Sequence, residues 1–116
     1  MRQVQLFLLN AIWRVSGLRG AGGALVRALA SDDEETRMLA GMFLVQAGKQ
    51  AEPLLREALE QRRNLPTVLT ILGDINARHL EGEIRRLSED RDPKVAQAAV
   101  DALRILNSHR PLSQSR

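Results

Sequence analysis

The sequence contains no cysteine and no tyrosine, and its aromatic residues are limited to Phe7, Trp13 and Phe43. The absence of cysteine excludes disulfide bridges, thiolate zinc sites and a cysteine nucleophile, and it suits a reducing compartment. Leu, Ala and Arg dominate instead, a composition that favours helices over sheets. With 116 residues, the chain is long enough to bury the core of one domain. We therefore expect a single all-α domain.

A long hydrophobic run is also missing. Residues 1–31 combine an apolar stretch with a distant Ala-Leu-Ala that resembles a signal-peptidase site, but three arginines separate the two. Gln5 and Asn10 interrupt the stretch, which is too short and too polar to span a bilayer. We expect a cytoplasmic protein without a membrane span.

Apolar residues recur at three- and four-residue steps between punctuating Gly, Asn and Pro residues. This pattern predicts six or seven helices, near residues 3–16, 22–30, 32–47, 50–61, 65–75, 78–89 and 93–107. Four residues that tolerate a left-handed backbone are expected to end helices: Gly17, Gly48, Asn76 and Asn107. Asp92 before Pro93 predicts a helix start, and Asn64 is expected to cap the helix that contains Pro66.

Four consecutive carboxylates, Asp32 to Glu35, directly precede an apolar run. Ser31 and Glu34 have the spacing of a capping box, and the positive end of a helix dipole favours acidic residues in the first turn. No histidine, hydroxyl base or partner ligand lies nearby in the sequence. We interpret this acidic run as a helix start and not as a reaction site.

Internal repetition is the strongest signal. A shift of 29 residues superimposes the apolar positions of three helices: Val26, Leu55 and Ile84; Leu29, Ala58 and Leu87; Gly22, Ala51 and Leu80. The intervening helices align in the same way, for example as Phe43, Ile71 and Ala102, with steps of 28 and 31 residues. A helix pair of this length cannot bury its own apolar face, so neighbouring pairs must stack into a solenoid.

Residues 31–60, SDDEETRMLAGMFLVQAGKQAEPLLREALE, resemble a HEAT-like repeat of the phycobilisome lyase type. The resemblance lies in the acidic start, Arg37, Ala40, the Ala47-Gly48 pair and Pro53, and residues 89–107 look like the first helix of a further unit. It implies an armadillo-like, right-handed α-α superhelix of about three and a half helix pairs over residues 1–108. It also implies a non-catalytic protein-binding scaffold, because this is the main role of the family. The alternative that it implies is an accessory, lyase-like or small-ligand-binding role.

An arginine ladder follows the 29-residue period at Arg27, Arg56 and Arg85, each one residue beyond a core position. On the concave face of a HEAT-like stack, these guanidinium groups would form a row able to bind a partner or phosphates. Glutamates four residues before and after Arg56 and Arg85 instead favour salt bridges along each helix. Salt bridging, partner binding and phosphate binding all stay open.

The first predicted helix carries two apolar stripes. Val4, Phe7, Leu8, Ala11, Ile12 and Val15 form one, and Leu6, Leu9 and Trp13 form the other. Such a helix is either buried on most sides or presents a patch that binds a partner, a second copy or a membrane surface. We take Leu6, Leu9 and Trp13 as candidate partner-binding residues, together with the arginine ladder.

No pattern points to catalysis or to a cofactor. The segment GLRGAGG, residues 17–23, lacks the features of a phosphate-binding loop and is expected to be an interhelical turn. His79 and Glu83 have no companion ligand pair, and His109 lies in a C-terminal tail, 109–116, that we expect to be disordered. Without a sustained basic patch, the net charge of +3 does not predict nucleic-acid binding. The sequence therefore predicts no enzyme, no metal and no cofactor.

Overall fold

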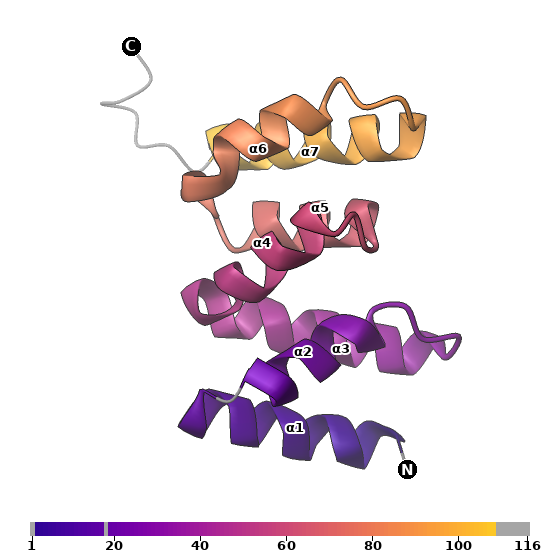
Figure 1. Ribbon diagram of the computed structural model, residues 1–116, viewed down its shortest axis with the longest axis vertical. Coiled ribbons are helices and arrows are strands. Elements are labelled where there is room, and N and C mark those ends of the chain that lie inside the picture. The colour runs from indigo at the N-terminus through magenta and orange to yellow at the C-terminus, as the bar shows by residue number, and fades with distance from the viewer. Residues whose placement is uncertain (1, 18, 109–116) are drawn as a thin grey trace. The chain divides into compact units, whose positions relative to one another are not determined.

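The computed structural model describes residues 2–17 and 19–108, so the C-terminal tail predicted at 109–116 lies outside the described residues. Helices form throughout the described ranges and no strand occurs in them, which confirms the all-α class. The α-helices are α1 (Arg2–Ser16), α2 (Arg19–Ala28), α3 (Glu34–Ala47), α4 (Glu52–Glu60), α5 (Leu65–Asp74), α6 (Glu81–Leu87) and α7 (Pro93–Ser108) (Figure 1). Two short 3-10 helices, η1 (Gly48–Ala51) and η2 (Arg78–Leu80), lead into α4 and α6.

The chain divides into two compact units, Met1–Asn64 and Leu65–Arg116, where the sequence pattern predicts one domain over 1–108. The first unit contains α1 to α4 with η1, and the second contains α5 to α7 with η2. Each has fully buried leucines at its centre, Leu25, Leu44 and Leu55 in the first unit and Leu69, Leu72 and Leu106 in the second. Most positions that the repeat aligns are buried, which confirms the predicted core.

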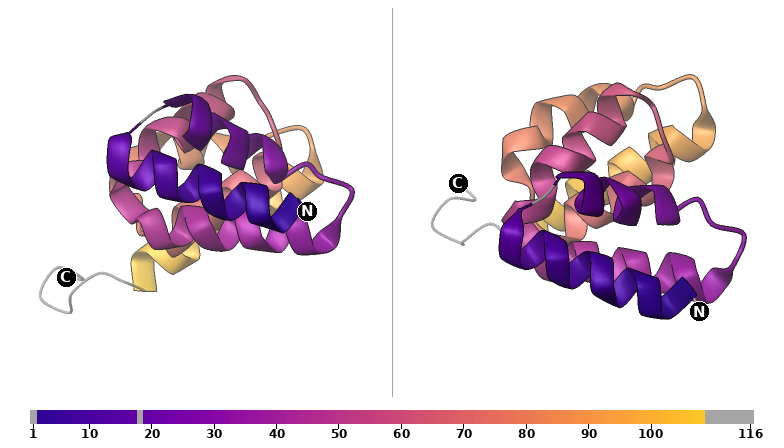
Figure 2. Two further views of the ribbon diagram at one scale, coloured as in Figure 1. Left: turned by 90° about the horizontal axis from the view of Figure 1, so that it is seen from below. Right: turned by 60° about the horizontal axis from the view of Figure 1, so that its bottom comes forward.

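In the first unit, α1 packs on α2 and α3, and α2 packs on α3 and α4. Helices α1 and α3 begin at the same end and run in the same direction (Figure 2). At their far end, the Gln50 side-chain amide donates a 2.9 Å hydrogen bond to the Trp13 carbonyl oxygen. This bond joins the last turn of α1 to the segment after α3.

Helix α2 begins earlier than predicted, because Gly20, Gly22 and Gly23 lie inside the helix and not in an interhelical turn. The reason for glycine is clearest at position 22. A β-carbon there would lie 2.5 Å from Leu54 Cδ1 and 2.8 Å from Trp13 Nε1. Glycine therefore allows α2 to approach α1 and α4 closely, with the indole of Trp13 filling the space that a side chain would need.

The acidic run does start α3, but Asp33 is the N-cap and not Ser31. The Asp33 carboxylate accepts a hydrogen bond from the Thr36 backbone amide at 3.2 Å and another from the Thr36 hydroxyl at 2.5 Å. Ser31 Oγ accepts from the Asp33 amide at 3.1 Å, so it orders the loop before the helix. The helix begins two residues later than predicted because the Asp33 side chain reaches the free amides of the first turn.

Three predicted helix ends have the expected left-handed backbone: Gly17 at φ 72°, Gly48 at φ 58° and Asn76 at φ 58°. Asn107 is an exception, since it lies inside α7 and the prediction that it ends this helix is wrong. Arg62 and Asn64 also have positive φ, at 55° and 47°, in the turn between α4 and α5. Pro93 opens α7 as predicted, and Asp92 accepts a 2.9 Å hydrogen bond from the Lys94 amide.

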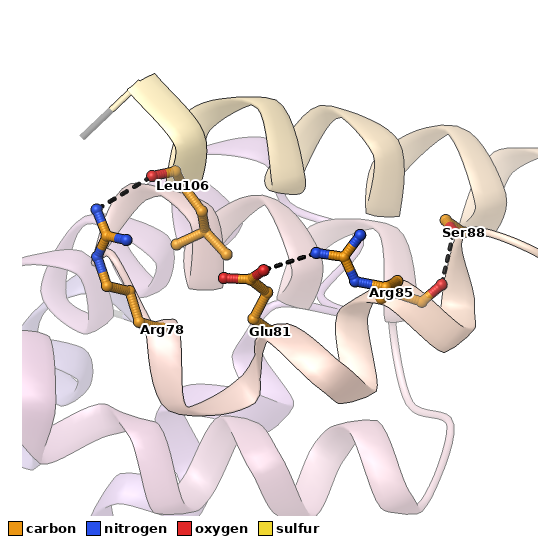
Figure 3. Close-up of polar contacts among 5 residues, drawn as sticks. All are labelled: Arg78, Glu81, Arg85, Ser88 and Leu106. Carbon is orange, nitrogen blue, oxygen red and sulfur yellow. Dashed lines mark hydrogen bonds and ion pairs between the residues drawn. The ribbon is translucent and has the colours of Figure 1, made fainter. Parts of the chain in front are cut away.

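In the second unit, α7 packs on both α5 and α6. The contact with α5 is close at Gly73, where a β-carbon would lie 3.2 Å from the Ala102 Cα. The Arg78 guanidinium donates a 3.3 Å hydrogen bond to the Leu106 carbonyl oxygen near the end of α7 (Figure 3). Because the last carbonyls of a helix have no partner within it, this arginine fastens the end of α7 to η2.

Candidate protein-interaction surface

The structure places the two apolar stripes of α1 on opposite sides of the helix. Leu6 and Trp13 are buried, with 4% and 2% of their surface exposed, and Leu9 is half-buried. The sequence pattern predicts a partner surface at Leu6, Leu9 and Trp13, and this prediction is wrong for Leu6 and Trp13, which are part of the core of the first unit. Hydrophobicity alone does not show which of two equally apolar stripes is buried. The fit of the Trp13 indole against Gly22 does, because it places the Leu6 and Trp13 stripe toward α2.

The other stripe faces outward. Five large apolar side chains of α1 are exposed, and we call them the outer face of α1: Val4, Phe7, Leu8, Ile12 and Val15. Val15 is 90% exposed and Leu8 is 59% exposed. In the described part of the first unit, no other helix covers this side of α1 (Figures 1 and 2). The outer face is therefore a continuous apolar strip along one helix.

Helix α3 borders this strip. The ring of Phe7 packs edge-on against that of Phe43, with 5.0 Å between the ring centroids, so the outer face is anchored to α3. Met38 and Met42 are also exposed on α3. Sequence reasoning did not single out these methionines, although their spacing of four residues puts them on one side of the helix. Flexible methionine side chains adapt readily to a partner surface.

Charged residues lie near both ends of α1, which itself carries Arg2 and Arg14 and no acidic residue. Residues 1–31 contain no acidic residue, and Arg14 is exposed near the C-terminal end of α1. At the other end, Gln5 and Leu9 of α1 line an open cleft of about 460 Å³ with Asp32 and Thr36. The first turn of α3 adds the exposed Glu34 and Glu35. Because this cleft is also lined by the buried Leu6, the acidic residues lie beside the outer face of α1 and not on it.

All three residues of the arginine ladder are exposed. Arg85 forms a 2.6 Å ion pair with Glu81 on α6 (Figure 3), as the spacing predicts. Arg27 lines an open cleft of about 270 Å³ with Gly20, Gly23 and Glu57. Arg27 and Arg56 belong to the first unit and Arg85 to the second, so a continuous row of the three stays a prediction.

The described residues contain no group of three or more His, Asp or Glu side chains placed to hold a metal ion. His79 and Glu83, the weak metal candidate, lie in η2 and α6, where His79 is exposed. None of the described helices has both the length and the apolar character needed to cross a membrane.

Comparison of the sequence and the structure with protein families, curated proteins and solved structures finds no match.

Proposed function

We propose that this chain is a non-catalytic interaction module that binds another protein through the outer face of α1. The observation that carries this proposal is the exposure of five large apolar side chains on a helix of 15 residues. Monomeric proteins rarely expose contiguous apolar surface beyond a few hundred Å², and larger patches mark interaction sites.

The architecture we propose is the HEAT-like solenoid that the repeat implies. The repeat-related positions are buried in both units: Leu55 in the first corresponds to Ile84 in the second, and Phe43 corresponds to Ile71 and Ala102. Longer helices alternate with shorter ones, α3 with α4 and α5 with α6. Repeat proteins of this kind offer extended surfaces for binding, and their fold does not require catalytic residues.

The arginine ladder is a weaker candidate for the same function. Arg85 already pairs with Glu81, and exposed pairs of this kind leave little net charge for a partner. Within the first unit the outer face of α1 makes one ring contact, between Phe7 and Phe43, while its five large side chains stay exposed. We therefore assign partner binding to this face first.

A photo-crosslinking amino acid at position 8 tests the proposal in cells of the natural source. We expect a protein species crosslinked at position 8 and absent when the same amino acid stands at Thr70, an exposed position of the second unit. The species, once identified and purified, must bind the wild-type chain and lose binding to Leu8→Glu. A crosslinked second copy of the chain would also count as a species specific to position 8. If no such species forms, the proposed function is refuted.

A further inference from the structure

We propose that the cleft between α2 and α4 binds a small organic monocarboxylate, with its carboxylate held by Arg27 and Arg63 and its apolar body lying along the two helices. We call this site the α2–α4 cleft, and its volume is about 270 Å³. It belongs wholly to the first unit, and none of the described residues that line it lies on α1. The site is therefore separate from the outer face of α1 and does not depend on the proposed function.

The cleft follows two helices that run in the same direction. Helices α2 and α4 begin at the same end (Figures 1 and 2), and Gly22 lies against Leu54 near both helix starts. The lining residues recur at three- and four-residue steps, which places them on one side of each helix: Gly20, Gly23, Val26 and Arg27 from α2, and Leu54, Glu57, Ala58 and Gln61 from α4 and its C-cap. Seven helical steps from Gly20 to Arg27 make the cleft roughly 10 Å long.

The half of the cleft nearer the helix starts is apolar. Its walls are the side chains of Leu54 and Ala58 on α4 and the backbone of α2 at Gly20 and Gly23. No heavy atom lies within 4 Å of the β-carbon position of Gly20, so this wall leaves open space. An apolar wall beside a few polar groups is the usual make-up of a small-molecule site.

Two guanidinium groups line the half nearer the helix ends. Arg27 lies in the last turn of α2, and its Nη1 is 3.6 Å from the position that a β-carbon would take at Gly23, so the side chain lies along the cleft wall. Arg63 follows the C-cap of α4. It is turned back toward the helix because Arg62 has a left-handed backbone and the Arg63 amide donates a 2.9 Å hydrogen bond to the Ala58 carbonyl oxygen.

The side chains of Arg27 and Arg63 take part in no hydrogen bond or ion pair with the described residues. Glu57 also lines the cleft but pairs with neither guanidinium, and its Oε1 accepts a 3.4 Å hydrogen bond from the Gln61 side-chain amide. Guanidinium groups bind carboxylates through two parallel N–H donors. Both arginines therefore have donors to offer to a ligand in the cleft.

The charges of the cleft favour a monoanion. Arg27 and Arg63 carry two positive charges and Glu57 carries one negative charge, which leaves an excess of one positive charge. One carboxylate neutralises this excess. A phosphate monoester has a charge close to −2 near neutral pH and would be repelled by Glu57. The apolar half adds a contact that an inorganic anion cannot use.

A titration followed by heteronuclear NMR tests the inference. The probes are phenylacetate and hexanoate, two monocarboxylates with compact apolar bodies. We expect saturable shifts of the Gly20 and Gly23 amide signals, with a Kd on the order of 1 mM. Phenylethylamine, which has a similar body but a positive charge, should cause none. The absence of saturable shifts with both carboxylates up to ~20 mM would overturn the inference. Tighter binding of phenyl phosphate than of phenylacetate would also overturn it.

Two substitutions test the role of the guanidinium groups. Arg27→Met and Arg63→Met remove a charge from exposed side chains, and each should raise the Kd for phenylacetate at least ~10-fold, as expected for the loss of a charged hydrogen bond. Arg86→Met removes an exposed arginine from α6 and should leave this Kd unchanged. Equal effects of all three substitutions would show a general attraction of anions to the chain and would refute the site.

A further variant tests the apolar half without a change of charge. Gly20→Leu places a side chain in the open space along α2 and should raise the Kd for both carboxylates at least ~10-fold. Gly82→Leu is the matched control, because the β-carbon position of Gly82 on α6 also has no heavy atom within 4 Å. Circular dichroism checks that both variants stay helical. Unchanged binding in a folded Gly20→Leu variant would contradict the proposed position of the apolar body.

Discussion

Gly22 lies on α2 where side chains from α1 and α4 leave no room for a β-carbon. A β-carbon at this position would meet the ends of the Leu54 and Trp13 side chains at 2.5 and 2.8 Å. Both groups belong to the core, so neither can move without disturbing its neighbours. A glycine that sequence patterns mark only as a helix breaker is here a packing residue.

We predict that Gly22→Ala lowers the free energy of unfolding by about 1–3 kcal/mol, the range typical of an overpacked core. Gly20→Ala in the same helix is the matched control, because no heavy atom lies within 4 Å of its β-carbon position. That substitution should raise the free energy of unfolding by about 0.5–1 kcal/mol through the better helix propensity of alanine. Urea denaturation followed by circular dichroism measures both, and equal effects of the two substitutions would contradict the packing explanation.

Asp33 is the second residue whose role is clear only from the structure. Asp33→Ala removes the acceptor for the Thr36 amide and hydroxyl, so we expect a loss of about 0.5–2 kcal/mol in the free energy of unfolding. Thermal denaturation checks this value. Asp32→Ala, one residue earlier and exposed, is the control and should cost less than half as much. A larger loss for Asp32→Ala would show that the cap is misassigned.

Among the elements, α1 shows what can and cannot be predicted from sequence. Its length, its apolar character and its end at Gly17 follow from residue type and spacing. Which of its two apolar stripes is buried does not, because Leu6 and Trp13 are no more hydrophobic than Phe7 and Leu8. Which stripe is buried depends on α2, where Gly22 leaves room for the indole of Trp13. This contact joins two separate helices, so it cannot be recognised from the apolar periodicity of either one.

Helix α7 depends on a contact from outside the helix, the hydrogen bond from Arg78 to the Leu106 carbonyl. We predict that Arg78→Met lowers the free energy of unfolding by about 0.5–1.5 kcal/mol, as expected for one hydrogen bond. The loss should be concentrated at the C-terminal end of α7, so amide hydrogen exchange should accelerate over residues 104–108 before it changes at Val95.

Arg86→Met is the control for Arg78→Met. Arg86 lies on α6 and is 77% exposed at its side chain, with only a 4.0 Å ion pair to Glu83. Its substitution should change the stability by a few tenths of a kcal/mol at most. Faster exchange at the end of α7 in this variant would show that Arg78 has no special role.

At the scale of the whole molecule, the helical class and the core positions were predictable because a 29-residue repeat leaves the same apolar positions in successive helices. The division into two units at Asn64 was not, since no break in the repeat accompanies it. The proposed interaction surface was predictable only in part. The sequence marks α1 as unusually apolar, but exposure of Val4 or Val15 depends on which helices surround it.

Trp13 gives the chain a built-in optical reporter. It is the sole tryptophan, there is no tyrosine, and both phenylalanines also lie in the first unit. The buried indole should emit at short wavelength in the native state, and its fluorescence follows the unfolding of the first unit alone, whereas far-ultraviolet dichroism follows helices in both. Coincident transitions by the two signals would mean that the units unfold as one cooperative body, and separate transitions would mean that each unit unfolds by itself.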